Sequence, residues 1–257
     1  MQSNLEGKVV VVTSAGGGIG LATVQALVAE GAHVVGGDLD VSALADENVL
    51  AVETDLATPE GCNALIRSAV EGHGRLNGLV NCLGLMFDRP EGFLSVTDDE
   101  WFRILDLNLF SVVRCTRAAI PAMLDAGGGA IVNVSSNAGR EPYWRSPDYA
   151  ASKGALLALT KALSAEFGVK GIRCNAVTPG PTTTPGFMDA VRQRAAETGV
   201  SVEEATKEFS VTRRRMALPR PGVPADVAPA ILFLLSDLAR QVTGSDYRVD
   251  GGAIQSI

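Results

Sequence analysis

An apolar strand, a glycine-rich turn and a helix follow one another near the start of the chain, and this order constrains the fold most strongly. Residues 8–13 carry four consecutive valines, a pattern typical of a strand buried on both faces of a parallel sheet. Residues 14–20 read SAGGGIG, and apolar residues then recur at helical spacing as far as Val28. Such a turn lets the backbone approach a diphosphate while the helix-start amides point toward the anion, so it predicts nucleotide binding.

Strands and helices continue to alternate along the rest of the chain. We expect further strands at residues 34–37, 50–53, 79–83, 130–134, 172–177 and 247–249. The expected helices between them occupy residues 58–73, 97–124, 148–169 and 225–235. This alternation predicts a single α/β domain over residues 1–257, a doubly wound, Rossmann-like parallel sheet with helices on both faces. Such sheets bind ligands beyond the carboxyl ends of their strands.

Capping signals set the starts of these helices. Thr58 precedes a proline, Thr97 forms a capping box with Glu100, and Asp148 is expected to cap the helix that follows it. Asn108 lies on an apolar stretch inside the helix expected over residues 97–124. An asparagine in that place indicates local strain or a polar contact with a purpose.

Composition and residue types argue against several classes of protein. The net charge of −7 disfavours nucleic acid, and the apolar run at residues 231–235 is too short to cross a bilayer. Without a recognisable signal peptide, we expect a cytosolic protein with no membrane partner. The four cysteines contain no C-x-x-C pair, which predicts core residues and neither a metal site nor a disulfide framework: Cys62, Cys82, Cys115 and Cys174.

The two histidines, His33 and His73, lie far from any candidate nucleophile in the sequence, and we expect structural or solvated roles for both. The chain also has no G-x-S-x-G motif. Together these features argue against a Ser-His-Asp hydrolase.

Asp38 ends the second expected strand, about 20 residues past the glycine turn. An acid at this place can accept hydrogen bonds from the adenosine ribose hydroxyls and would repel a 2′-phosphate. Gly17 and Leu39 occupy positions where a phosphate-binding cation could have been. The sequence therefore favours NAD over NADP, while the alternatives are a capping role for Asp38 and Asp40 as the competing acid.

Tyr149 and Lys153 are four residues apart at the start of a helix, so their side chains share one face. A tyrosine has an ordinary pKa of about 10, and a neighbouring cation favours the phenolate and lowers that value. The pair can therefore form a general acid/base. The structural alternative is an exposed ring over an aliphatic stem.

Residues 185–216 depart from the strand–helix alternation and read as one or two short polar helices, with a capping box at Ser201 and Glu204. We expect a substrate lid here, and the alternative is a surface insertion without a function. The basic triplet Arg213, Arg214 and Arg215 could meet an anionic substrate, but a solvated run of charge is the favoured interpretation.

Together these motifs resemble the short-chain dehydrogenase/reductase family over almost the whole chain. The resemblance rests on an ordered set of motifs: TSAGGGIG at 13–20, Asp38, Asp55-Leu56, NCLG at 81–84, LNL around Asn108, Ser136, YAASK at 149–153 and PGPTTT at 179–184. Two departures stand out, because Ser14 replaces the first glycine of the family's turn and Cys82-Leu83 replace asparagine and alanine.

The resemblance implies a role for each matching residue. Tyr149 would be the acid/base, Lys153 would lower its pKa and hold the nicotinamide ribose, and Ser136 would position the substrate oxygen, with Ser135 as the fallback. Asn108 would hold a water that links Lys153 to solvent. Asp55 would contact adenine, Asn81 would line the cofactor channel and Thr184 would bind the carboxamide. The remaining expected cofactor residues are Ser14, Gly17, Gly18, Ile19, Gly20, Asp38, Leu56, Pro179 and Gly180.

The sequence thus predicts an NAD-dependent oxidoreductase acting on a secondary alcohol or ketone, with a homotetramer expected from the resemblance alone. Its candidate pocket residues suggest an apolar substrate body: Leu85, Met86, Phe87, Tyr143, Trp144, Phe187 and Met188. The alternatives are an NAD-sensing protein without turnover, and a lyase or epimerase that uses the same Tyr-Lys pair. The sequence does not identify the substrate.

Overall fold

The structure, a computed structural model, describes residues 3–256 and contains a seven-stranded sheet. The strands are β1 (Val9–Thr13), β2 (His33–Asp38), β3 (Val49–Glu53), β4 (Gly78–Asn81), β5 (Gly129–Val134), β6 (Ile172–Pro179) and β7 (Asp246–Val249). They lie in the order β3-β2-β1-β4-β5-β6-β7, and all neighbouring pairs are parallel. The strand order changes direction between β1 and β4, where doubly wound sheets bind ligands. The predicted fold class is confirmed.

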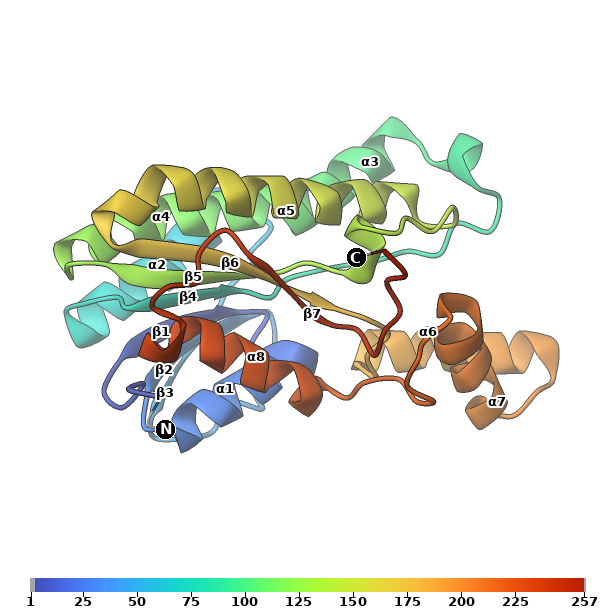
Figure 1. The fold of residues 1–257 in the computed structure, drawn as a ribbon, viewed down its shortest axis with the longest axis horizontal. Coiled ribbons are helices and arrows are strands. Elements are labelled where there is room, and N and C mark those ends of the chain that lie inside the picture. Colours follow the sequence, from blue (N-terminus) through green and yellow to red (C-terminus); the bar gives the residue numbers. More distant parts are fainter. Residues whose placement is uncertain (1–2, 257) are drawn as a thin grey trace.

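Helices cover both faces of this sheet (Figure 1). One face carries α2 (Pro59–His73), α4 (Ser111–Asp125) and α5 (Pro147–Phe167), and the other carries α1 (Gly18–Ala29) and α8 (Pro224–Leu235). α3 (Asp98–Leu105) precedes α4. α6 (Pro185–Thr198) and α7 (Val202–Lys207) project away from the sheet after the end of β6.

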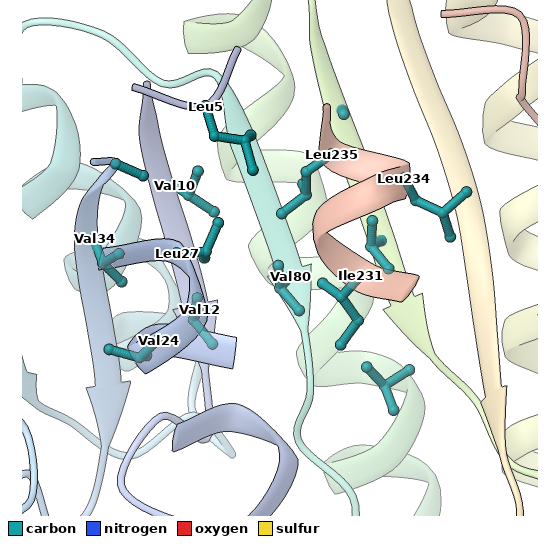
Figure 2. Close-up of a cluster of buried hydrophobic side chains, with 14 of the residues drawn as sticks. Leu5, Val10, Val12, Val24, Leu27, Val34, Val80, Ile231, Leu234 and Leu235 are labelled. Atoms are coloured by element: carbon teal, nitrogen blue, oxygen red, sulfur yellow. The ribbon is translucent and has the colours of Figure 1, made fainter. Parts of the chain in front are cut away.

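The four valines of β1 divide between two hydrophobic cores. Val10 and Val12 pack with residues of α1 and α8, including Leu27 and Ile231 (Figure 2). The side chains of Val9 and Val11 pack on the opposite face, against the layer formed by α2 and α4. Because successive side chains of a strand point to opposite faces, an unbroken valine run fills both layers.

The helix predicted over residues 97–124 is present as an unbroken helical run over residues 98–125, but it contains a π turn that the sequence did not predict. Residues Asp106–Phe110 form a π turn between α3 and α4, and the Ser111 amide bonds the Asp106 carbonyl, five residues back. π turns of this kind occur often at functional sites. The predicted capping box of Thr97 and Glu100 is present at the start of α3.

The prediction that Asp148 caps α5 is wrong. Ser146 occupies the N-cap position, and Asp148 lies fully buried in the first turn. Its carboxylate accepts the Tyr149 amide at 2.9 Å and pairs with the Arg89 guanidinium at 2.8 Å. A buried carboxylate requires such partners, so the ion pair, and not capping, explains this residue.

The α6–α7 segment, residues 185–216, has a small core of its own. Val191, Ala195 and Ala205 are buried together, and Phe187 and Phe209 pack against them with ring centroids 5.7 Å apart. The predicted capping box of Ser201 and Glu204 is present. A π turn over Glu208–Thr212 follows α7.

Several smaller expectations can be compared with the structure. Within residues 3–256 the four cysteines are free thiols, three of them buried and Cys82 half-buried. His33 and His73 stack with ring centroids 5.1 Å apart, which is a structural role. No helix in the described part of the chain combines the length and apolarity that a membrane crossing needs.

Candidate active site

The glycine turn lies where β1 ends and α1 begins, and its glycines are sterically required. A Cβ on Gly20 would lie 1.9 Å from the Ser14 carbonyl oxygen, and one on Gly16 would lie 2.0 Å from the Asp40 carbonyl oxygen. Gly17 is the N-cap of α1 and has open space where its Cβ would be. The first amides of α1 are therefore accessible to an anion over a bare backbone, which suits a dinucleotide diphosphate.

Ser14 adopts a left-handed backbone conformation, with φ of 53°. This conformation explains why glycine is the family's residue here, since a Cβ in this region costs about 1–2 kcal/mol. The turn accepts the serine side chain, but in a strained backbone.

Asp38 and Asp40 differ clearly in their surroundings. The Asp38 carboxylate accepts the Gly16 amide at 2.9 Å and the Leu39 amide at 2.7 Å, so it is fixed beside the glycine turn. Asp40 is exposed and accepts the Ser42 amide at 2.9 Å, and the Ser42 side chain together with this amide lowers its pKa. Of the two acids, Asp38 is the one placed at the strand end next to the turn.

The next two strands bring Asp55, Leu56 and Asn81 toward the same edge. Asp55 is exposed, whereas Leu56 is buried in the core beside α2. The Asn81 amide nitrogen donates to Asn133 at 2.8 Å and to Thr116 at 3.2 Å, inside the protein. Among the described residues its side-chain oxygen has no partner. The Asn81 side chain thus joins β4 to β5 and α4.

Tyr149 and Lys153 meet on α5 as the four-residue spacing predicts. The Lys153 Nζ lies 5.8 Å from the Tyr149 ring centroid and donates to the Val134 carbonyl at 2.9 Å. Lys153 is 2 % exposed, and burial lowers its pKa to about 8. A Cβ on Gly84 would lie 2.9 Å from Nζ, so the loop after β4 needs glycine to admit the amine.

The pKa of Tyr149 is raised in the structure, whereas the sequence predicted that Lys153 lowers it. Burial raises the pKa of the Tyr149 phenol above its ordinary value. The Ser136 hydroxyl and the positive charge of Arg214 oppose this effect. The desolvation of the ring is the larger influence here, because α5 begins in the protein interior.

The two serines after β5 have separate roles. The Ser135 hydroxyl donates to the Lys153 carbonyl at 2.9 Å and is committed to the backbone of α5. Ser136 is 9 % exposed, caps the short turn Asn137–Gly139 and interacts with the Tyr149 phenol. The serine available beside Tyr149 is therefore Ser136.

Asn108 lies in the π turn and is completely buried. Its side-chain oxygen accepts the Leu85 amide at 2.8 Å, and its nitrogen donates to the Leu85 carbonyl at 2.9 Å and to Ser152 at 3.1 Å. The residue fastens the loop after β4 to the helix that carries Tyr149, which is the purposeful polar contact expected from the sequence.

The PGPTTT motif at residues 179–184 follows β6 and lies at the same edge of the sheet. A Cβ on Gly180 would lie 2.7 Å from the Asp250 carbonyl oxygen, so the chain after Pro179 is packed tightly against the C-terminal strand. Thr184 caps α6, and its Cγ2 lies 3.3 Å from where a Cβ on Gly18 would be. The start of the α6–α7 segment thus packs on the glycine turn.

Only some of the predicted pocket residues come together. Met86 and Tyr143 line a small cavity of about 20 Å³, and Phe209, Arg213 and Arg214 line it from the α6–α7 segment. The other predicted residues lie elsewhere or are not part of this lining: Phe87 packs under Arg89 and Arg103, Phe187 packs on Phe209, and Trp144 is 61 % exposed.

The basic triplet is not uniformly solvated. The favoured interpretation is correct for Arg215, which is exposed, and wrong for Arg214, which is half-buried with its Cζ 4.9 Å from the Tyr143 centroid. Among the pocket residues that sequence reasoning missed are Phe209 and Arg214. The π turn over Glu208–Thr212 shifts the helical register before the triplet, so no regular period placed either residue.

A parallel sheet with a bare glycine turn, an acid beside it and a buried Tyr-Lys-Ser group defines a dinucleotide-dependent oxidoreductase class. The family model described as enoyl-(acyl carrier protein) reductase matches residues 14–253. The chain belongs to the short-chain dehydrogenase/reductase family, whose members use nicotinamide cofactors.

Characterised relatives span essentially the whole chain. It is 36 % identical to 2-(S)-hydroxypropyl-CoM dehydrogenase 3 of Xanthobacter autotrophicus, covering 98 % of each chain. It is 32 % identical to 2-keto-3-deoxy-L-fuconate dehydrogenase of Xanthomonas campestris pv. campestris, over 97 % of this chain and 81 % of the relative. The L-sorbose reductase of Gluconobacter frateurii, solved with NADPH and L-sorbose, superposes with a TM-score of 0.93 at 30 % identity over 100 % of both chains.

Proposed function

We propose that the protein is an NAD-dependent oxidoreductase that interconverts a secondary alcohol and its ketone, with Tyr149 as the general acid/base. The observation that carries this proposal is the meeting of Tyr149, Ser136 and Lys153 at the carboxyl edge of the sheet, beside the glycine turn. The dehydrogenase and reductase activities named for its relatives support the same reaction class.

Each residue around the reacting carbonyl would have a separate chemical role. The nicotinamide ring, when bound, supplies or accepts the hydride. In the reduction direction the Tyr149 hydroxyl gives its proton to the substrate oxygen, and in oxidation the phenolate takes it back. The Ser136 hydroxyl holds that oxygen in place, and the Lys153 ammonium would hold the ribose. The Ser136 hydroxyl and the Arg214 charge favour the phenolate against the burial of the ring.

Lys153 and Asn108 would also return the proton to solvent. The Asn108 side-chain oxygen accepts one protein hydrogen bond, from the Leu85 amide, and so retains acceptor capacity for a water. A water held there would connect the buried Lys153 amine to the exterior. The π turn that positions Asn108 supports this relay, since such turns recur at functional sites.

The preference for NAD rests on Asp38, whose carboxylate is fixed beside the glycine turn and would repel a 2′-phosphate. The NADPH bound to L-sorbose reductase shows that a structural neighbour uses the other cofactor. Asp55 and Leu56 would contact adenine, Asn81 would lie along the cofactor, and Thr184 would bind the carboxamide.

We also propose a substrate lid, a homotetramer and a cytosolic location. The α6–α7 segment would act as a lid, supported by its small separate core and by Thr184, which packs on the glycine turn. A homotetramer is supported by large exposed apolar residues such as Phe102 and Phe110, 69 % and 48 % exposed. The four free cysteines support a cytosolic location.

The chemistry is tested by the Tyr149→Phe substitution. General acid/base catalysis typically contributes about 10²–10⁴ in rate, so kcat should fall by that factor while NADH binding, followed by fluorescence, is retained. Trp144→Phe, an exposed aromatic change nearby, serves as the control. An unimpaired kcat in the Tyr149 variant would remove this residue from its role.

The cofactor is tested by titrating NADH and NADPH against the same protein. We expect NADH to bind at least about tenfold more tightly, and the ratio to narrow in Asp38→Asn because the repelling charge is gone. Asp40→Asn should leave the ratio unchanged, since Asp40 is exposed beyond the turn. Tighter binding of NADPH to the unmodified protein would contradict the proposal.

A further inference from the structure

Arg214 occupies an unusual place for a residue in a basic triplet. It is half-buried, and its guanidinium carbon lies 4.9 Å from the centroid of Tyr143. Within residues 3–256 it forms no ion pair, and none of its nitrogens donates a hydrogen bond. Its positive charge lowers the pKa of the Tyr149 phenol, so the guanidinium lies within electrostatic range of that residue.

The acidic groups near Arg214 are already engaged. Glu141 influences the guanidinium, but its carboxylate accepts the Gln255 amide at 2.6 Å. Asp88, on the cavity wall, forms a two-pronged ion pair with Arg145. Arg213 has a partner in Glu208 at 3.4 Å. Arg214 therefore faces the cavity without an ion-pair partner among residues 3–256, although the negative charge of Glu141 acts on it.

The Arg214 guanidinium is only partly hydrated. Burial lowers the pKa of Arg214 from its ordinary value, which indicates that the guanidinium has lost part of its hydration. A desolvated charge is unfavourable unless a partner of opposite sign is present. A guanidinium is also a planar fork of donors that fits a carboxylate through two parallel hydrogen bonds.

We infer that Arg214 binds a carboxylate on the substrate, so that the enzyme acts on hydroxy acids or oxo acids. This inference rests on the proposed function, because it assigns the substrate class of the same site. The carbon that reacts would lie at Tyr149 and Ser136, while Met86 and Phe209 contact the apolar chain between the two polar ends.

The first test compares matched substrates on the full-length protein. Short oxo acids and their methyl esters, varied in the distance between carbonyl and carboxylate, are assayed by NADH absorbance. A hydrogen bond to a charged group contributes about 1.5–3 kcal/mol, so at least one acid should exceed its ester by about tenfold or more in kcat/KM. Sulfonate analogues of the preferred acid tell whether the site requires a planar carboxylate.

The second test removes the charge. In Arg214→Met the acid-to-ester ratio of kcat/KM should fall at least about tenfold, and Arg214→Lys should restore part of it. Arg215→Met is the matched control, because Arg215 is the exposed neighbour in the same triplet, and it should keep the wild-type ratio. A wild-type ratio in Arg214→Met would overturn the inference.

A binding readout separates this inference from the proposed reaction. Butyrate and hexanoate cannot be reduced, yet they should bind the enzyme–NADH complex and change its fluorescence, and the Arg214→Met complex should bind them at least about tenfold more weakly. If neutral ketones are turned over and acids are not preferred, the inference about Arg214 is wrong while the proposed function stands. If no alcohol or ketone reacts, the proposed function fails, while carboxylate binding still decides the role of Arg214.

Discussion

The glycine-turn edge of the sheet and the α6–α7 segment, which are the two walls of the proposed site, are held in different ways. The first wall stands on two large cores that fill both faces of the sheet, and Gly16 and Gly20 have backbone atoms within 2.0 Å of their missing Cβ positions. The second has three buried apolar residues of its own, while Gly186 and Gly199 have open space around them. One wall is sterically fixed, and the other has room for change.

This difference separates two tasks of the site. Hydride and proton transfer need atoms held in one geometry, which the core-backed wall supplies around Tyr149 and Lys153. Substrate recognition can be carried by a less constrained segment, and Arg214 is on that segment. We therefore expect substitutions in the first wall to change stability and rate together, and those in the second to change mainly the choice of substrate.

The largest effect is expected where a charge is buried in the first wall. Arg89→Met leaves Asp148, which is 0 % exposed, without its ion-pair partner at 2.8 Å. Removing one partner of a buried pair typically costs about 3–5 kcal/mol, so the free energy of unfolding in urea should fall by that amount. Activity should fall too, because Asp148 holds the first turn of α5 beside Tyr149.

The matching pair on the α6–α7 segment joins Arg192 to Asp189 at 2.6 Å, but the two side chains are 57 % and 73 % exposed. Arg192→Met should change the free energy of unfolding by less than about 0.5 kcal/mol. The double variant Arg89→Met/Asp148→Leu should recover part of the loss, since no lone buried charge remains. Equal losses at Arg89 and Arg192 would contradict the contrast between the walls.

Alanine substitutions of glycine should have opposite signs in the two walls. Gly20→Ala places a Cβ 1.9 Å from the Ser14 carbonyl oxygen and should destabilise the protein by about 3 kcal/mol. Gly186→Ala, in the first turn of α6, meets no atom within 4 Å and should stabilise by about 0.5 kcal/mol through helix propensity. Urea unfolding measures both, and a stable Gly20→Ala protein would mean that the turn can shift.

The first wall was predictable from the sequence because local pattern and tertiary packing agree there. The valine run specified a strand covered on both faces, and the turn and Asp38 follow from the same strand–helix unit. The four-residue spacing likewise placed Lys153 beside Tyr149. The sign of the pKa shift at Tyr149 was missed, because desolvation depends on what the rest of the chain packs around the ring.

The second wall was predictable only in outline. The capping box at Ser201 and the polar helices are present, but the π turn at Glu208–Thr212 changes the register just before Arg214. The same kind of turn, at Asp106–Phe110, changes the register within the helix predicted over residues 97–124. Neither turn has a local sequence signature, because a π turn depends on contacts with the rest of the fold.

A pH-dependent contribution to stability is expected from Lys153 in the first wall. Its folded pKa of about 8 lies below the ordinary 10.5, so between these values the unfolded chain binds more protons. Stability due to this residue therefore rises with pH. From pH 7 to 9.5 the wild type should gain about 2 kcal/mol relative to Lys153→Met. Lys207→Met, an exposed lysine of α7, should follow the wild type in the same urea experiments, and a flat difference for Lys153 would contradict its burial as a charged group.

The smallest effect distinguishes how the two walls unfold. Ser14 and Arg215 both have left-handed backbones, with φ of 53° and 51°, and glycine relieves that strain. After the entropy that glycine adds to the unfolded chain, each change to glycine should stabilise by about 0.5–1 kcal/mol. If both walls unfold together, Ser14→Gly and Arg215→Gly shift the thermal midpoint alike. If the α6–α7 segment opens first, only Ser14→Gly shifts the main transition, while hydrogen exchange shows the added protection near Arg215.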